Sequence, residues 1–404
     1  MQQFHTEREQ RFIDLAATLA DDFATRASQH DEEGSFPYEN YERLKETGYS
    51  VLTIPEELGG MGASLLERIK AQERLAQGCG PTALAINMHF NVMSLLINLW
   101  QRERPSAVEA MLRQIAAERL IIGGSGSEPD NAVSILRPRT TAERVDGGWR
   151  VSGRKIFSTQ SIALDRYFAE ATWKEGVHDG QQTGTIITFL IPRDTPGFII
   201  KDDWHTMGMR STESRSTELK DAFIPESAVF LERPVVTRDG ITNLFPRAPF
   251  TIGSVYIGIA TAARDFVVEF MRDRPRFPLD KPMSHLPSVY TKVGEMDMLL
   301  ETARAGLWKA AAEADREAPR TWLRKSVAAR MVAMENSARV VDLALRAVGG
   351  ASYFKRLPLE RYYRDVRAGL FHPFDSDETL ELLGKTAFGI AMYDEDTIRA
   401  LKEL

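Results

Sequence analysis

Two apolar seams near the end of the chain constrain its fold more than any other feature. In each seam the apolar residues alternate spacings of four and three, the pattern of long helices packed side by side at shallow angles. The seams are Val289, Val293, Met296, Leu300, Ala303, Leu307, Ala310 and Ala314, and then Val327, Met331, Met334, Ala338, Val341, Leu345 and Val348. Gly349 and Gly350 end the second helix. We therefore predict packed long helices in the last part of the chain.

The middle of the chain has the pattern of a β domain. The segment TTAERVDGGWRVSGRKIFSTQS predicts two strands joined by an Asp-Gly-Gly turn. The segments YFAEATW, TIITFLIP and GFIIKDDW predict further strands, separated by turn-rich stretches. We expect short antiparallel strands in a small barrel or sandwich.

The first part of the chain is predicted to be helical, because Phe12, Leu15, Leu19 and Phe23 recur at helical spacing. The fold class expected is therefore α+β and multidomain. The three expected domains are an N-terminal helical domain over 1–118, a central antiparallel β domain over 119–240 and a C-terminal helical domain over 241–404.

Composition excludes several classes of protein. The net charge of −6 argues against a general nucleic-acid binder, which carries a basic excess. The longest apolar region, APFTIGSVYIGIATAA, is short and rich in small residues, so we expect a buried helix and no membrane span. The segment MQQFHTEREQRF lacks the apolar stretch of a signal peptide. Cys79 is the single cysteine, which excludes an intrachain disulfide and favours a cytoplasmic location.

The common catalytic motifs are absent. No two histidines have metal-ligand spacing on a helix, so we expect no metal site. There is no Walker loop and no G-x-S-x-G motif, and GGSGSEP lacks the third glycine of a dinucleotide fingerprint. The chain therefore shows no signature of a P-loop enzyme, a serine hydrolase or a Rossmann dehydrogenase.

Three weaker signals remain, each also compatible with an ordinary turn, strand or loop. IIGGSGSEP ends a strand in small residues, which lets a flat ligand approach the backbone. KIFST places Phe157 beside the hydroxyls of Ser158 and Thr159. RPRF sets Arg274 three residues before Phe277, which suits a pyrophosphate and a ring. Together they suggest a site for a flat, phosphorylated ligand.

The order of these segments resembles the acyl-CoA dehydrogenase family of flavoproteins over nearly the whole chain. The matching segments are FPYENYERLKETGYSVLTIPEELGGMGAS, GSGSEPD, GWRVSGRKIFST, MGMRSTESRSTELKDAFIP, RPRF, AVGG and LERYYRDVRA. The resemblance implies a C-terminal four-helix bundle, FAD between the β domain and the C-terminal helices, and a homotetramer. It also implies α,β-dehydrogenation of a small-molecule substrate, an acyl-CoA thioester, with electrons passing to an electron-transfer flavoprotein.

The resemblance implies roles for individual residues. The cofactor-binding residues are Ser127, Phe157, Ser158, Thr159, Arg274, Phe277, Gly349 and Gly350. Ser127, Phe157 and Thr159 match positions at the flavin ring, while Arg274 and Phe277 match the pair that binds the pyrophosphate and adenine side of a partner subunit's FAD. Arg247 matches an arginine near the thioester. His89 is a further candidate for the substrate pocket, with a hydrogen-bonded core histidine as the alternative.

This chain departs from the family at the catalytic base. The usual glutamate, nine residues after Arg364, is replaced by Pro373, and the second family position holds Pro246. His372 stands beside the first of these positions. It resembles the histidine of the flavin-dependent monooxygenases of the same fold, which take reduced flavin from a partner flavin reductase. A neutral pKa suits histidine to holding or passing a proton there.

Other departures concern the ligand contacts. EPDNAVS replaces the family's EPGAGSD, which puts its contacts to the CoA thioester region in doubt. Pro278 replaces a glycine after Phe277, and Arg346 replaces a glutamine before the Gly-Gly pair.

Asp375 offers a second candidate for the base. Asp375 and Glu378 fit a D-x-x-E capping box at the start of a helix. Asp375 is also the residue that we expect to abstract the α-proton if the protein is a dehydrogenase.

The leading hypothesis is an acyl-CoA dehydrogenase-like flavoenzyme. One alternative is a flavin-dependent monooxygenase or oxidase that uses reduced flavin and O2, with His372 in the chemistry. The other is a flavin-binding, catalytically silent interaction protein.

Overall fold

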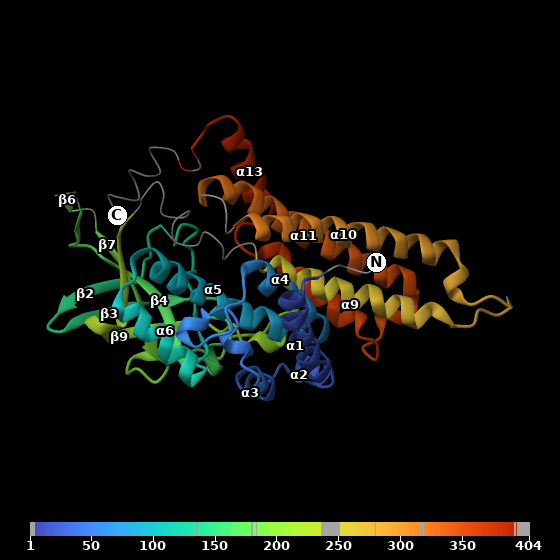
Figure 1. The fold of residues 1–404 in the computed structure, drawn as a ribbon, viewed down its shortest axis with the longest axis horizontal. Coiled ribbons are helices and arrows are strands. Elements are labelled where there is room, and N and C mark those ends of the chain that lie inside the picture. Colours follow the sequence, from blue (N-terminus) through green and yellow to red (C-terminus); the bar gives the residue numbers. More distant parts are fainter. Residues whose placement is uncertain are drawn as a thin grey trace.

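The computed structural model describes residues 5–134, 136–178, 181–182, 184–235, 251–278, 280–314, 319–391 and 393. An N-terminal helical domain comes first, then a central β-sheet domain, and then a C-terminal helical domain (Figure 1). This arrangement confirms the predicted fold class. The last N-terminal helix ends at Glu118, the first strand begins at Ile122, and the next α-helix among the described residues begins at Gly253.

The N-terminal domain is built on helices with well-defined starts. Its helices are α1 (Glu7–Ala24), α2 (Ala27–Glu33), α3 (Tyr38–Glu46), α4 (Leu65–Gly78), α5 (Gly80–Glu103) and α6 (Ser106–Glu118). Capping boxes begin two of them: Thr6 with Glu9 at α1, and Ser64 with Glu67 at α4. The apolar face predicted for α1, which includes Phe12, is buried.

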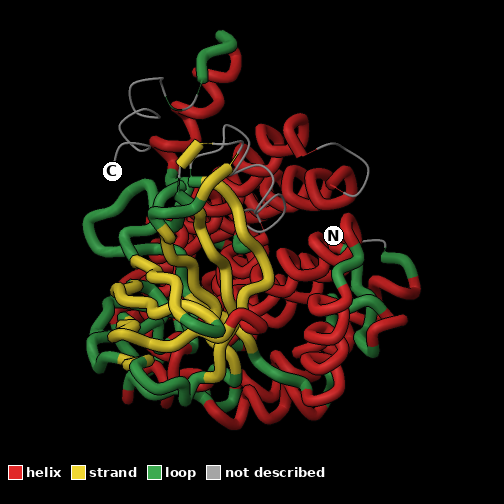
Figure 2. Tube along the Cα trace, turned by 90° about the vertical axis from the view of Figure 1, so that its left-hand side faces the viewer, coloured by secondary structure: helices red, strands yellow, loops and turns green. Residues whose placement is uncertain are grey.

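The strands form one main sheet, grouped on one side of the molecule in Figure 2. They are β1 (Ile122–Gly124), β2 (Thr141–Val145), β3 (Gly148–Lys155), β4 (Arg166–Trp173), β7 (Thr185–Pro192), β8 (Phe198–Ile200), β9 (Thr217–Pro225) and β10 (Val229–Pro234). The order is β10-β7-β4-β2-β3-β9-β8, with β1 beside β4, while β5 (Val177–His178) and β6 (Gln181–Gln182) pair separately.

The predicted hairpin is present, since Val145 pairs with Gly148 across an Asp146-Gly147 turn. Gly147 has φ of +78°, which glycine adopts without steric cost. The sheet is not wholly antiparallel as expected, because β1 and β2 pair with β4 in parallel. Neither strand reaches β4 through a tight hairpin, and longer connections permit the parallel direction.

The C-terminal domain contains α9 (Gly253–Arg272), α10 (Pro287–Ala314), α11 (Pro319–Val348), α12 (Leu359–Arg367) and α13 (Ser376–Ala387). Helices α10 and α11 run antiparallel: Trp322 donates to the carbonyl of Ala310 at 2.8 Å, and Arg339 pairs with Glu295 further along. The predicted seams lie between them and are largely buried, as at Leu300. The loop between α9 and α10 projects at the end of this bundle far from the strands (Figure 1).

Two apolar helices bear on the question of a membrane span. The segment expected to be a buried helix forms α9, whose first residues are almost all buried. Among the residues with described structure, α5 alone has the length and composition of a span, and 67% of its most apolar stretch is buried inside the protein. Such burial is typical of the core helix of a folded domain.

Candidate flavin site

A cleft of about 570 Å³ lies where the three parts of the chain meet. This volume falls within the range of small-molecule sites. The described residues that line it are Leu84, Met88, Gly124, Ser125, Gly126, Ser127, Phe157, Thr159, Trp204, Thr206, Met207, Gly208, Met209, Thr212, Ser214, Arg364, Ala368, Phe371, His372 and Pro373. The lining comes from α5, from loops of the β domain, and from α12 with the turn after it. Most of it is apolar or hydroxylic.

Phe157 presents an aromatic face to the cleft. Its ring is 60% exposed and stands edge-on to Trp204, with ring centroids 6.2 Å apart. Its φ of +55° is rare for a bulky residue, and strain of this kind is concentrated at functional sites. An exposed ring, held in an unfavourable backbone conformation beside a second aromatic residue, fits the flat ring of a flavin.

Thr159 and Ser127, which the sequence predicts to bind the flavin, also line the cleft. Ser214 donates to the Thr159 hydroxyl at 3.0 Å, which orients that hydroxyl. Ser125 accepts from the amide of Ser127 at 3.0 Å and donates to the carbonyl of Ile156 at 2.6 Å. A side chain added at the neighbouring Gly126 would meet nothing within 4 Å. A flat ligand therefore has room against this stretch of backbone.

Ser158 does not line the cleft, contrary to the expectation for this residue. Its side chain is fully buried and lies 2.9 Å from the Thr217 hydroxyl and 3.2 Å from that of Tyr167. Its amide donates to the carbonyl of Arg215. Phe157 and Thr159 face the cleft, whereas the residue between them faces the interior of the β domain.

His89 does not line the cleft either, which corrects the substrate-binding expectation. The ring is fully buried: Nε2 donates to the carbonyl of Ser50 at 2.7 Å, and Nδ1 accepts from the amide of Ile122 at 3.0 Å. Burial lowers the pKa of His89 to about 4. Both ring nitrogens join the N-terminal helices to the first strand, so His89 is the hydrogen-bonded core histidine of the alternative reading.

His372 lies on the cleft wall, at the end of a short 3-10 turn after α12. Its Nε2 lies 2.6 Å from the hydroxyl of Tyr256, and its carbonyl accepts from Arg330 at 2.7 Å. Burial, and then the charge of Arg330, lowers the pKa of His372 to about 3. The imidazole is therefore neutral at physiological pH.

Asp375 lies outside the cleft lining and caps α13. Its Oδ1 accepts from the amide of Glu378 at 2.9 Å, and Glu378 accepts from the amide of Asp375 at 3.1 Å. The predicted capping box is thus complete. Asp375 therefore has a structural role as the N-cap of α13, and it is not among the residues that line the cleft with His372.

Arg364 is the one other ionisable residue among the described residues of the lining. Its guanidinium donates to both oxygens of Asp31 and to Glu360. These partners raise the pKa of Arg364 and balance its charge within the wall. The cleft thus has little net charge to offer a ligand.

Four predicted cofactor residues lie far from the cleft. Arg330 of α11 contacts His372 at the cleft, whereas the helix ends at Val348. At about 1.5 Å per residue, these two points on the helix are about 27 Å apart. The remote residues follow the ends of two helices, Gly349 and Gly350 after α11, and Arg274 and Phe277 after α9.

These remote residues have few partners among the residues that the structure describes. Phe277 is 98% exposed, and a side chain added at Gly349 or Gly350 would meet nothing within 4 Å. Arg274 lies 4.5 Å over the ring of Phe270, and its Nη1 is buried with no partner among the residues described. Arg247 and Pro246 lie outside the described residues.

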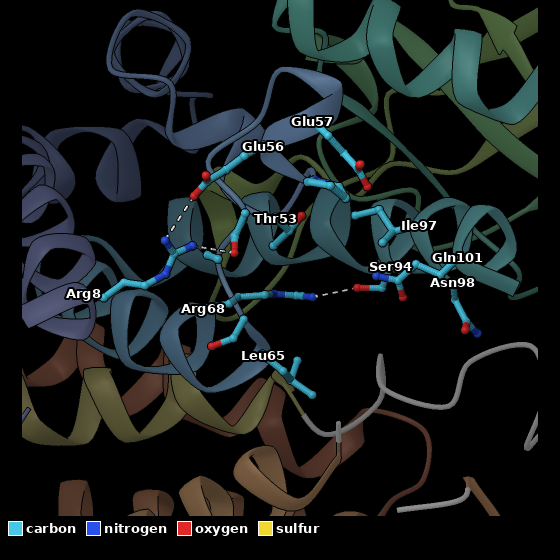
Figure 3. A pocket seen from close by; sticks show the side chains of 14 residues that line it. Arg8, Thr53, Glu56, Glu57, Leu65, Arg68, Ser94, Ile97, Asn98 and Gln101 are labelled. Atoms are coloured by element: carbon cyan, nitrogen blue, oxygen red, sulfur yellow. Dashed lines mark hydrogen bonds and ion pairs between the residues drawn. The ribbon is translucent and has the colours of Figure 1, made fainter. Parts of the chain in front are cut away.

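A second cavity, of about 630 Å³, lies between the loop before α4 and one face of α5 (Figure 3). Both arginines that line it are engaged by neighbouring groups. Arg8 pairs with Glu56 and Glu67, and Arg68 donates to Asn91 at 2.8 Å and to Ser94 at 3.0 Å. No residue predicted from the sequence to bind a ligand lies in this cavity.

Within the described ranges, no group of three or more His, Cys, Asp or Glu side chains is arranged to hold a metal ion.

Sequence reasoning missed Trp204, which lines the cleft, and Tyr256, which contacts His372 behind it. Tyr256 sits in an apolar helical run, where its hydroxyl was the only signal. Trp204 lies just before a matching family segment but carried no pattern of its own.

Comparisons with known proteins agree with this geometry. The N-terminal, middle and C-terminal domains of acyl-CoA dehydrogenase match residues 6–104, 124–222 and 250–376. The chain is 35% identical to the putative acyl-CoA dehydrogenase YdbM of Bacillus subtilis, over 95% of this chain and 98% of that protein. It is 28% identical to the amino sugar nitrososynthase DnmZ of Streptomyces peucetius, over 94% and 93%.

Solved structures show the same fold. KijD3, in complex with FMN and a dTDP-linked amino sugar, superposes with a TM-score of 0.86 at 27% identity, over 98% of this chain and 97% of that one. Butyryl-CoA dehydrogenase from Megasphaera elsdenii superposes with a TM-score of 0.85 at 22% identity, over 96% and 100%. Family membership and FMN-bound relatives together support a flavin cofactor. The chain therefore belongs to the acyl-CoA dehydrogenase family, whose members are flavoenzymes.

Proposed function

We propose that this protein is a flavin-dependent monooxygenase that takes reduced flavin from a separate reductase and uses dioxygen. The observation that carries the proposal is the charge of the cleft: its described lining holds no aspartate or glutamate. Acyl-CoA dehydrogenation removes an α-proton and needs a base within hydrogen-bond reach, with a pKa near the working pH. Neither ionisable residue of the lining meets this requirement.

His372 is a poor base for that reaction. Its Nε2 is already hydrogen-bonded to Tyr256, and burial beside Arg330 holds its pKa near 3. A group with so low a pKa does not take a proton from carbon at neutral pH. Arg364 is a cation and accepts no proton. Asp375 is bound to the amide of Glu378 at the start of α13.

The same features suit oxygenation. In that reaction the reduced flavin supplies two electrons, one oxygen atom enters the substrate, and the other leaves as water with two protons. Phe157 and Thr159 are the residues we assign to the flavin ring, and Ser127 to its pyrimidine end. The apolar walls, from residues such as Leu84 and Trp204, exclude bulk water. His372 provides a neutral hydrogen-bond donor beside the reacting atoms.

Relatives support both the proposal and a second candidate. Nitrososynthases at 28–29% identity match over 90% or more of this chain. The putative acyl-CoA dehydrogenase YdbM, at 35%, is the observation that favours acyl-CoA dehydrogenation as the second candidate. In that case an electron-transfer flavoprotein accepts the electrons, and Asp375 must move inward to act as the base.

Anaerobic and aerobic flavin spectra separate the candidates. Oxidised flavin-loaded protein is mixed anaerobically with butyryl-, octanoyl- and palmitoyl-CoA; we expect no bleaching of the flavin. Reduced protein is then mixed with oxygen in a stopped-flow instrument. We expect reoxidation in two resolved steps, with His372→Ala shortening the interval between them.

The other outcomes are also informative. Rapid bleaching by any acyl-CoA would overturn the proposal in favour of the dehydrogenase, and its loss in Asp375→Asn would assign the base. A single reoxidation step at the rate of free reduced flavin, without bleaching, would favour the catalytically silent interaction protein.

A further inference from the structure

We infer that Tyr256 is a positioning residue that holds His372 in the tautomer with its proton on Nδ1, the nitrogen turned to the cleft. The two side chains come from different elements, Tyr256 from α9 and His372 from the turn after α12, and their Nε2 and hydroxyl oxygen lie 2.6 Å apart. Only the use of the Nδ1–H in oxygenation rests on the proposed function; the tautomer itself does not.

The surroundings of Tyr256 decide which group donates. Tyr256 is fully buried, and its hydroxyl has no other partner in the described part of the chain. If His372 donated from Nε2, the tyrosine proton would be left buried and unpaired, which is unfavourable because the hydroxyl loses its hydrogen bond to water and gains none. If Tyr256 donates to Nε2, the buried hydroxyl proton is paired. The second arrangement leaves the proton of the neutral imidazole on Nδ1.

The other ring nitrogen is free for a ligand. His372 lines the cleft, and its Nδ1 makes no hydrogen bond to any residue described. Nδ1 is also not a fully buried atom. A protonated Nδ1 can therefore donate to an oxygen atom of the reacting group, but it cannot accept a proton. This tautomer gives a reason, independent of pKa, why His372 does not act as the α-proton base.

Packing holds both rings in place. Gly369 lies against Tyr256, since a side chain there would come within 3.1 Å of the ring. Arg330, from α11, donates to the carbonyl of His372 at 2.7 Å. The two residues are thus fixed from α9, α11 and the turn after α12 at once. These contacts restrict the hydrogen bond between Tyr256 and His372 to a single geometry.

The charged groups nearby keep both residues neutral. Burial raises the pKa of Tyr256 well above its usual value, and Asp365 of α12 raises it further, while Arg330 opposes that change. Burial and Arg330 lower the pKa of His372. Burial lowers the pKa of Arg330, and Tyr256 opposes that change, as do Glu378 and Asp375 at the start of α13. The tautomer is therefore expected to persist from about pH 5 to 8, since neither group titrates in that range.

Nitrogen-15 NMR of ring-labelled histidine tests the inference on the full-length protein. His372→Gln identifies the signal of His372. In wild type we expect a neutral imidazole with a protonated Nδ1 and an unprotonated Nε2, unchanged from pH 5 to 8. In Tyr256→Phe, which removes the donor to Nε2, we expect the population to shift from the Nδ1–H tautomer towards the Nε2–H tautomer. Tyr49→Phe removes a second buried hydroxyl, on a residue outside the described cleft lining, and should leave the signal unchanged.

Two readouts separate this inference from the proposed function. A wild-type His372 with its proton on Nε2 would overturn the inference, and this result needs no variant to fold. An unchanged tautomer in folded Tyr256→Phe would also overturn it. Where the oxygenase is active, Tyr256→Phe should lower kcat by roughly 10²-fold with KM unchanged. A wild-type protein that has the Nδ1–H tautomer but lacks oxygenase chemistry would refute the proposed function and leave the tautomer assignment supported.

Discussion

Asp31 of α2 and Arg364 of α12 form an ion pair that ties the N-terminal helices to the wall of the cleft. Arg364 donates to both carboxylate oxygens, at 3.0 Å to Oδ1, and also to Glu360. It lies on the same helix as Asp365, which accepts from the amide of Met209 at 2.6 Å. The two residues fix α12 against the first two domains and thereby position the turn that carries His372.

Asp31→Ala should destabilise the protein. The change leaves the partly buried Arg364 with Glu360 but without Asp31, and we expect the free energy of unfolding to fall by about 1.5–3 kcal/mol, because the charge-assisted hydrogen bonds to Asp31 are lost. Chemical denaturation measures it. Glu46→Ala removes an exposed pair with Arg43 and should change stability by less than about 1 kcal/mol. Equal losses in the two variants would contradict the role given to the Asp31 pair.

Asp365 should make stability depend on pH. Burial raises its pKa to about 6. The folded state therefore holds the proton more tightly than the unfolded chain, whose aspartate pKa is about 3.9. The stability due to this group is fully present below pH 3.9 and is lost as the pH rises through 6.

Asp365→Asn keeps an acceptor for Met209 and removes the buried charge. We expect the variant to exceed wild type in stability at pH 7.5 by an amount on the order of 1–3 kcal/mol, with the difference shrinking towards pH 5. Urea unfolding at both pH values measures it. A variant that is less stable than wild type by the same amount at both pH values would show that the charge is not the determining factor.

Phe157→Ala should weaken flavin binding without unfolding the protein. The exposed ring is the aromatic surface that we assign to the flavin, and the loss of one aromatic contact corresponds to roughly a threefold to tenfold increase in Kd. Flavin fluorescence titration measures it. Phe223, on β9, is exposed and lies outside the cleft lining, so Phe223→Ala serves as the matched control. Unchanged affinity in Phe157→Ala would remove the residue from the proposed site.

Arg274→Ala should distinguish FAD from FMN. Arg274 lies far from the cleft of its own chain, and in the predicted oligomer its guanidinium would contact a flavin held by a neighbouring subunit. We expect weaker FAD binding, because the variant lacks charge-assisted bonds to a pyrophosphate, and unchanged FMN binding. Isothermal titration with both flavins measures the difference. Equal affinity of wild type and variant for FAD would mean that the adenosine half makes no contact there.

The same arrangement leads us to expect an oligomer, with a homotetramer as the predicted state. Light scattering at several dilutions tests it: flavin release should accompany dissociation if FAD spans two subunits. A monomer that retains FAD fully would contradict this.

Local patterns in the sequence determined much of this protein. The seams of α10 and α11, the Asp146-Gly147 hairpin and the capping box of Asp375 could all be predicted, because each depends on residues within a few turns of one another. Family segments in order predicted that Phe157 and Thr159 would meet at one cleft with Ser127.

Only the tertiary structure decided which side chains face the cleft. Ser158 is adjacent to two lining residues yet points into the β domain, and His89 is buried against the first strand while His372 is not. The contact between Tyr256 and His372 joins residues 116 positions apart. No local pattern encodes such a contact, because it depends on how α9, α11 and α12 pack, and packing is set by the side chains of all three helices together.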